Sequence, residues 1–218
     1  MIRFKVCCIQ SVEEAWLAIR YGASALGLVS AMPSGPGPIP EELIAEIAAA
    51  VPPGVATFLL TSLRRPEEII AQQRLCRTNT VQLCDSIFGG ANGYRRLRKA
   101  MPGIGIVKVV HVTGEEAIAE ALAVAPHVDA ILLDSGNPRL KVKELGGTGR
   151  THDWALSRRI RDAASVPLYL AGGLNPDNVA EAIRQVKPFA VDVCSGLRTN
   201  GILDESLLNR FAGILKEG

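Results

Sequence analysis

Several features that would assign this chain to other classes of protein are scarce. Aromatic residues make up 5% of the 218 residues, which leaves few stacking platforms for single-stranded nucleic acid. The net charge is only +2, so the strongly basic surface of a nucleic-acid binder is missing. No apolar run approaches the roughly 18 residues of a membrane span, and the charged start Met1-Ile-Arg-Phe-Lys lacks the apolar stretch of a signal peptide. We therefore expect a cytoplasmic protein with neither a nucleic-acid nor a membrane partner.

Cysteine is present, but not in a pattern that holds zinc. The five cysteines are odd in number and scattered, and none forms a CxxC pair. They are Cys7, Cys8, Cys76, Cys84 and Cys194. No metal site is expected, and in a reducing cytoplasm most of these residues are expected to be free thiols or small buried hydrophobes.

Short apolar runs alternate with segments of helical spacing along the whole chain. The runs are typical of strands covered on both faces, as in parallel sheets; they are residues 2–9, 25–29, 55–60, 81–83, 105–110, 130–133, 166–170 and 190–193. The helical segments are residues 12–21, 40–50, 66–73, 91–100, 114–124, 153–163, 175–186 and 204–215. Eight strand–helix pairs in 218 residues give about 27 residues a pair, the rhythm of βαβ units.

Two architectures suit this alternation: an open doubly wound sheet or a closed (β/α)8 barrel. Eight units that end on a helix, with no visible reversal of order, favour a single (β/α)8 TIM barrel over residues 1–218. The one unusual loop, residues 30–39, is too rich in Pro and Gly for a helix or a strand.

Active sites of such barrels lie at the carboxyl ends of the strands, and a phosphate site commonly follows strands 7 and 8. Two glycine-containing turns stand at those places, and their backbone N–H groups can approach an anion closely. The residues are Gly172, Gly173, Ser195 and Gly196. They predict a phosphate cradle, although tight strand-to-helix turns without a ligand explain the same glycines.

Two further strand ends carry groups that can move protons. Asp134 follows three apolar residues, where desolvation raises the pKa of a carboxyl group toward the range of a general acid, although an Asp that caps the next loop is the plain alternative. Cys7 alternates with Lys5 toward the barrel interior, where an ammonium group favours a thiolate; a buried inert thiol is the alternative. The same alternation places Cys8 with Phe4 and Val6 on the helix-facing side.

Five motifs spread over nearly the whole chain carry a resemblance to a known family. They are Lys5-Val-Cys7, Leu132-Leu-Asp-Ser135, Gly146-Gly-Thr-Gly149 with Asp153-Trp154, Leu170-Ala-Gly-Gly-Leu-Asn-Pro-Asp-Asn178 and Val191-Asp-Val-Cys-Ser-Gly196. On these residues the chain resembles the phosphoribosylanthranilate isomerases of tryptophan biosynthesis.

The resemblance implies an Amadori rearrangement, in which a phosphorylated ribosylamine becomes a 1-amino-1-deoxyketose without any cofactor. It implies that Asp134 is the general acid, that Cys7 is the general base, and that the glycine turns hold the phosphate of a small phosphorylated sugar. Residues of the substrate loops are then Gly146, Gly147, Thr148, Gly149, Gln82 and Arg198. The expected assembly is a monomer or a homodimer.

The chain departs from the family pattern at four places. Cys8 replaces a Gly, the loop of residues 30–39 lacks the usual Ser-Pro-Arg, Cys84-Asp85 replaces His-Gly, and Arg198 stands where an acidic residue is common. The missing arginine contacts the anthranilate carboxylate in the family, and Arg198, Arg139 and Arg150 are candidates to replace it. Two alternatives therefore stay open: a paralogous isomerase of another phosphorylated amino-sugar, and a non-catalytic phosphosugar-binding protein.

Overall fold

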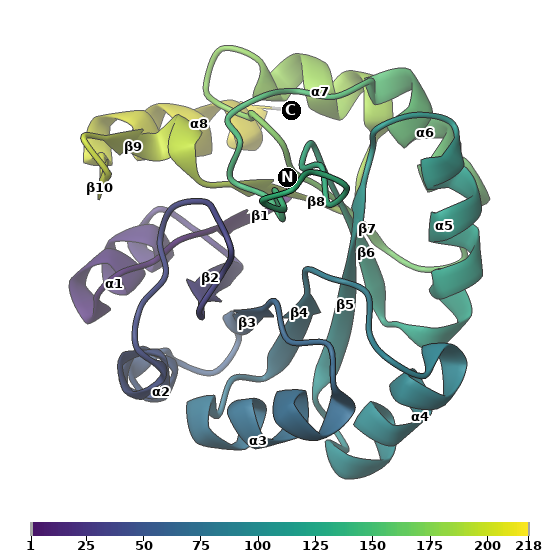
Figure 1. The fold of residues 1–218 in the computed structure, drawn as a ribbon. Coiled ribbons are helices and arrows are strands. Elements are labelled where there is room, and N and C mark those ends of the chain that lie inside the picture. Colours follow the sequence, from purple (N-terminus) through teal and green to yellow (C-terminus); the bar gives the residue numbers. More distant parts are fainter. Residues whose placement is uncertain (1, 218) are drawn as a thin grey trace.

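The computed structural model describes residues 2–217 and arranges eight parallel strands as a closed barrel inside a ring of helices (Figure 1). Each strand pairs with its neighbours in chain order, and β8 closes the ring on β1. The single (β/α)8 barrel that the alternation predicts is confirmed, and the open doubly wound sheet is excluded.

The elements lie where the sequence pattern places them. The barrel strands are β1 (Arg3–Val6), β2 (Ala25–Val29), β3 (Ala56–Thr61), β4 (Thr80–Leu83), β5 (Gly105–His111), β6 (Ala130–Asp134), β7 (Leu168–Leu170) and β8 (Ala190–Val193). The α-helices are α1 (Val12–Arg20), α2 (Glu41–Ala50), α3 (Pro66–Cys76), α4 (Gly90–Ala100), α5 (Glu116–Val124), α6 (Trp154–Ala163), α7 (Val179–Val186) and α8 (Glu205–Glu217). Two 3-10 helices, η1 (Ala125–His127) and η2 (Ser195–Leu197), and a hairpin of β9 (Arg198–Thr199) and β10 (Ile202–Leu203) are additional.

The hairpin has a plain local cause. Asn200 and Gly201 both have positive φ, of 51° and 81°, and join β9 to β10. An Asn-Gly pair is the commonest solution for a two-residue hairpin turn, because both residues tolerate the left-handed region.

Successive side chains along each strand point to opposite faces of the sheet, and this divides the core into two layers. Side chains on one face, such as Val6, Leu26 and Ile131, pack between barrel and helices, where the larger cluster lies. Side chains on the other face, such as Ala25, Phe58 and Val107, fill the barrel interior. Close packing of both layers holds the strand ends in fixed positions, which is what a site built from several strands needs.

Within residues 2–217, no helix is long and apolar enough to cross a membrane.

Candidate functional site

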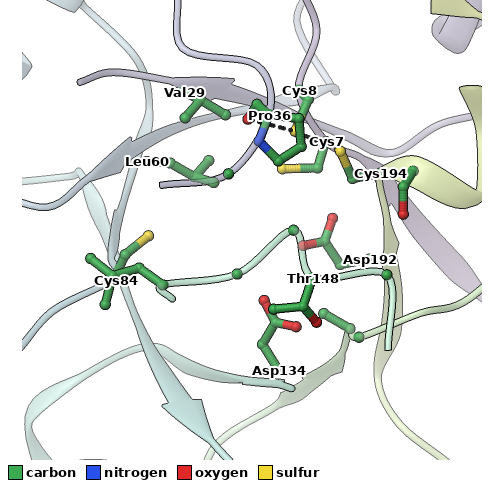
Figure 2. Close-up of a pocket in the computed structure, with 18 of the residues that line it drawn as sticks. Cys7, Cys8, Val29, Pro36, Leu60, Cys84, Asp134, Thr148, Asp192 and Cys194 are labelled. Atoms are coloured by element: carbon green, nitrogen blue, oxygen red, sulfur yellow. Dashed lines mark hydrogen bonds between the residues drawn. The ribbon is translucent and has the colours of Figure 1, made fainter. Parts of the chain in front are cut away.

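A cavity of about 690 Å³, counted with the space open to solvent, lies at the carboxyl ends of the barrel strands. Its walls come from β2, β3, β4, β6 and β8 and from the segments that follow β1, β2, β4, β6, β7 and β8. In Figure 2, Cys7 and Asp134 reach into this cavity from opposite sides, and Asp192 lies between them. This is the face where active sites of such barrels are found.

Asp134 ends β6 and is buried, with 8% of its surface exposed. Its Oδ1 accepts a hydrogen bond from the Ser135 N–H at 2.7 Å. Burial raises the pKa of Asp134 to about 6, with a further contribution from the negative charge of Asp192. The carboxyl group therefore holds a proton near neutral pH more readily than an ordinary aspartate, as a general acid must.

Cys7 follows β1 and shares the barrel interior with a buried ion pair. Lys5 Nζ lies 2.7 Å from Asp192 Oδ2, a residue directly opposite Lys5 in the β1–β8 register. The pKa of Cys7 is lowered, first by hydrogen bonding from the Cys8 thiol and then by the charge of Lys5, against the opposing effect of burial. The sequence pattern did not identify Asp192, although a carboxylate within the apolar run 190–193 was a signal for it.

Cys8 does not lie on the helix-facing side that the alternation predicts. Its φ is +61°, so the extended backbone stops at Val6 and Cys8 turns into the cavity wall. There its Sγ lies 2.6 Å from Cys194 Sγ (Figure 2). The left-handed residue breaks the two-residue period on which the prediction depended.

Gly37 is the residue that makes room for Cys8. A Cβ built on Gly37 lies 2.6 Å from the Cβ of Cys8, and Gly37 has a φ of +88°. The Gly-rich loop after β2 is therefore fitted to a cysteine at position 8.

We expect Gly37→Ala to destabilise the fold by at least about 1–2 kcal/mol, because an L side chain in the left-handed region costs about that much and the new methyl group overlaps Cys8. Chemical denaturation measures the loss. In a Cys8→Gly background the overlaps with the Cβ and Sγ of Cys8 are gone, so the cost of Gly37→Ala falls. Equal costs in both backgrounds contradict the fit. Gly213→Ala in α8, where an added Cβ has no neighbour within 4 Å, is the control and is not destabilising.

The loops after β7 and β8 close the end of the cavity beside Asp192. Gly172, Gly173 and Ser195 line it, and none of the described backbone hydrogen bonds uses the N–H groups of the two glycines. Gly196 is set back from the cavity wall, because a Cβ there would lie 2.0 Å from the Leu174 carbonyl oxygen. Glycine is thus required there for close backbone packing, and the predicted place of Gly196 in the phosphate cradle stays a prediction.

The loop after β6 covers the cavity. Gly146, Gly147, Thr148 and Gly149 all line it, as does Gln82 of β4. The Thr148 and Ser135 hydroxyls lie 2.6 Å apart, which fastens the loop beside Asp134. Gly146 has a φ of +132°, and an added Cβ would lie 2.6 Å from Asp134 Oδ2, so only glycine lets the loop approach the acid this closely.

Arg198 does not line the cavity, so its predicted role in the substrate loops stays a prediction. Its side chain is only 5% exposed, and its Nη2 lies 2.9 Å from Glu14 Oε2 in α1. Arg150 pairs with Glu144 at 2.5 Å, and Arg139 lies 3.3 Å from Glu116, both with largely exposed side chains. Each of the three arginines is therefore engaged by a carboxylate and lies outside the cavity wall.

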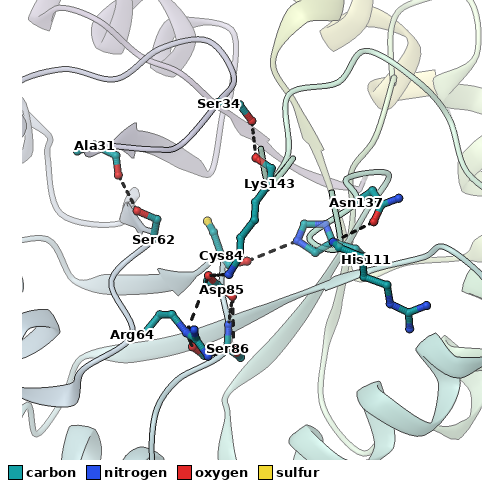
Figure 3. A network of polar contacts seen from close by, with 11 residues as sticks. Ala31, Ser34, Ser62, Arg64, Cys84, Asp85, Ser86, His111, Asn137 and Lys143 are labelled. Carbon is teal, nitrogen blue, oxygen red and sulfur yellow. Dashed lines mark hydrogen bonds and ion pairs between the residues drawn. The ribbon is translucent and has the colours of Figure 1, made fainter. Parts of the chain in front are cut away.

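A lysine that the sequence pattern did not identify lines a second pocket, which shares Cys84 with the cavity. Lys143 Nζ is 2.5 Å from Asp85 Oδ2, directly after Cys84 in the wall (Figure 3). Arg64 lies on the other side of Asp85, 4.0 Å away. This cation comes from the loop after β6, where no local sequence rule fixes a side-chain position.

The fold and a cavity that combines a proton-holding carboxyl group with a thiol of lowered pKa define a (β/α)8-barrel isomerase of the acid–base type. The chain belongs to the N-(5'phosphoribosyl)anthranilate (PRA) isomerase family, whose profile matches residues 4–213. The resemblance stated from the sequence motifs is thereby confirmed.

Individual relatives agree over almost the full length. The chain is 39% identical to N-(5'-phosphoribosyl)anthranilate isomerase 2 of Methanosarcina mazei, over 96% of this chain and 92% of the relative. It is 33% identical to the phosphoribosyl anthranilate isomerase of Thermotoga maritima, whose crystal structure superposes with a TM-score of 0.83 and full coverage of both chains. A second solved isomerase, 31% identical with a TM-score of 0.81 and full coverage of both chains, holds reduced 1-(o-carboxyphenylamino)-1-deoxyribulose 5-phosphate. These comparisons do not favour the paralogous isomerase or the non-catalytic binder.

Proposed function

We propose that this protein converts N-(5'-phosphoribosyl)anthranilate into 1-(o-carboxyphenylamino)-1-deoxyribulose 5-phosphate by an Amadori rearrangement. The observation that carries the proposal is the pair of opposite pKa shifts in one cavity: the pKa of Asp134 is raised and that of Cys7 is lowered. Pairs of titratable groups with diverging pKa values are a sign of divided acid and base roles.

In the proposed mechanism Asp134 donates its proton to the furanose ring oxygen. The C1–oxygen bond breaks, and the nitrogen lone pair forms an imine at C1. The Cys7 thiolate then removes the proton from C2, and the electron pair of that C–H bond forms the enolamine. Tautomerisation adds a proton at C1 and releases one from the C2 hydroxyl, so the sum of steps is an isomerisation without a co-reactant.

The phosphate is proposed to lie against Gly172, Gly173 and Ser195, which line the cavity and whose backbone N–H groups are in none of the described backbone hydrogen bonds. The aromatic ring is proposed to lie at the other end, among Leu60 and Leu145. Asp134 and Cys7 then flank the sugar between the two anchors. A cytoplasmic monomer or homodimer is part of the proposal, and one solved Thermotoga maritima relative is described as dimeric.

The test is direct. Phosphoribosylanthranilate is added to the purified protein, and the decay of anthranilate fluorescence is followed against a Cys7→Ala control. Turnover above the control supports the proposal, and decay at the control rate refutes it.

A further inference from the structure

Two cysteine thiols meet in the cavity wall, where two neighbouring strands of the barrel end. Cys8 follows β1 and Cys194 follows β8, and their Sγ atoms lie 2.6 Å apart. A disulfide bond is about 2.05 Å long, so the two sulfur atoms need to approach by only about 0.5 Å to be joined. In Figure 2, Cys7, Cys8 and Cys194 lie together at one edge of the cavity.

The backbone holds the two thiols in this position. The Cys7 N–H donates a hydrogen bond of 2.8 Å to the Val193 carbonyl oxygen, so the β1–β8 pairing continues up to the two cysteines. Arg198 ties the segment after β8 to the segment after β1, because its Nη2 donates to the carbonyl oxygens of Cys7 and Cys8. Its Nη1 lies 2.9 Å from Glu14 Oε1, which fixes the guanidinium group. A bond between the thiols therefore requires little movement of the backbone.

Both thiols line the cavity, so a small oxidant can reach them from solvent. Cys194 is partly exposed, whereas Cys8 is only 4% exposed. Cys194 is therefore the thiol that a reagent meets first, and Cys8 is the thiol placed to displace the reagent from it. A resolving thiol has to lie next to the sulfur that reacts first, and the contact of 2.6 Å meets this condition.

Cys8 also stabilises the thiolate of Cys7. The pKa of Cys7 is lowered first by the hydrogen bond from the Cys8 thiol, and then, against the effect of burial, by the charge of Lys5. The other titratable groups that face Cys7 are Asp192 of β8, which raises its pKa, and Cys84 after β4, which stays neutral because burial raises its own pKa to about 12. A disulfide at Cys8 has no S–H to donate, so the largest of the lowering effects is lost and the pKa of Cys7 rises.

We propose that Cys8 and Cys194 are a site of reversible oxidation, at which a low-molecular-weight disulfide converts the two thiols into a disulfide bond and thereby lowers the ionised fraction of Cys7. The Cys194 thiolate attacks one sulfur atom of the oxidant, whose S–S bond breaks and releases a first thiolate. The Cys8 sulfur then attacks the Cys194 sulfur of the mixed disulfide, and a second thiolate leaves.

The atoms and electrons of this exchange balance. Two protein thiols are oxidised, one disulfide is reduced to two thiols, and the protons of the two cysteines end on the two released thiolates. The effect of the bond on the reaction rate rests on the proposed function, whereas the formation of the bond does not.

Disulfide mapping tests the bond without any turnover. The purified protein is equilibrated in glutathione buffers from fully reduced to fully oxidised, the free thiols are alkylated, and tryptic peptides are analysed by mass spectrometry. We expect the peptides of residues 6–20 and 185–198 to be joined in oxidised buffers and separate after treatment with dithiothreitol. Fragmentation is expected to place the bond at Cys8 and the alkyl group at Cys7. A bond at Cys7, glutathione that stays on Cys194, or no bond in oxidised glutathione overturns the proposal.

The rate at which iodoacetamide alkylates Cys7, followed against pH, measures the ionisation of that thiol in the reduced and the oxidised protein. We expect the midpoint to move to higher pH by about one unit in the oxidised protein, the value of one hydrogen bond to an ionised group. Turnover at pH 7 is expected to fall by about 10-fold and to recover on reduction. An unchanged midpoint in protein that carries the bond overturns the effect on Cys7.

Cys8→Ser and Cys194→Ser each remove one partner of the bond, and Cys76→Ser, which removes a buried thiol at the end of α3, is the matched control. Each protein is compared with itself, as the ratio of its rates in oxidised and in reduced glutathione. We expect a ratio of about 0.1 for the wild type and for Cys76→Ser, and no change of rate for the other two variants. The same loss of rate in all four proteins overturns the proposal. Protein that forms the bond with the shifted midpoint but does not turn over phosphoribosylanthranilate overturns the proposed function alone, so the two failures are distinguishable.

Discussion

Asp134→Asn is expected to remove most of the turnover of phosphoribosylanthranilate while making the folded protein more stable above pH 6. An amide cannot protonate the ring oxygen, and general acid catalysis is worth about 10²–10⁴ in rate. The amide oxygen still accepts the Ser135 N–H bond, so the local geometry is retained. Steady-state assays are expected to show the loss in kcat, and the limb of the wild-type pH–rate profile near pH 6 is expected to vanish in the variant.

The stability change follows from linkage. The pKa of Asp134 is about 6 in the folded protein against a reference value of 3.8, so the folded state binds the proton more tightly than the unfolded chain. The stability of the wild type therefore falls as pH rises through the range 4 to 6, by about 2–3 kcal/mol for a shift of this size. The variant lacks this titration, so its advantage appears above pH 6 and is absent below pH 4.

Chemical denaturation at pH 4 and pH 7.5 measures the difference. Asp162→Asn on α6 is the matched control, because its exposed carboxylate bonds to Arg158 and Arg161 and its pKa is lowered. That exchange is expected to give no gain at pH 7.5 and no loss of turnover. A variant of Asp134 that keeps full activity, or that loses stability at both pH values, contradicts the assignment of a buried general acid.

The order of strands and helices could be predicted because each element has a signal in its own stretch of sequence. Residues 25–29 and 190–193 are short apolar runs between polar segments, and the structure gives β2 and β8 the same bounds. The rule that sites of this fold lie at strand ends then placed Asp134 and Cys7 in one cavity without knowledge of any distance.

The residues that escaped prediction are those whose neighbours are remote in sequence. Arg198 looks like a free cation in the chain, but its partner Glu14 lies 184 positions away. Lys143 lies in a long irregular loop, and its position beside Asp85 is fixed by contacts 58 residues apart. The position of Cys8 was predicted wrongly for another reason. Its positive φ turns the side chain from the helix-facing side to the cavity, and nothing about a cysteine in a sequence indicates a positive φ.

Cys7→Ser is the complementary expectation, and it separates the two chemical steps. The hydroxyl of serine keeps the approximate shape of the thiol but is far too weak an acid to be ionised near neutral pH, so the base is lost. We expect kcat to fall by about 10²–10⁴. Asp134 remains, so ring opening continues while removal of the C2 proton becomes slow. The variant is expected to show a larger isotope effect with C2-deuterated substrate than the wild type.

Cys76→Ser is the matched control, since Cys76 is buried at the end of α3 outside the cavity, and its pKa is raised to about 12, mainly by burial. It is expected to retain the wild-type rate. The lowered pKa of Cys7 depends on the Cys8 thiol and on Lys5, so these two neighbours stabilise the thiolate. If Cys7→Ser turns over substrate at the wild-type rate with an unchanged isotope effect, the base is another group, and Asp192, the remaining carboxylate between Cys7 and Asp134, is the next residue to replace.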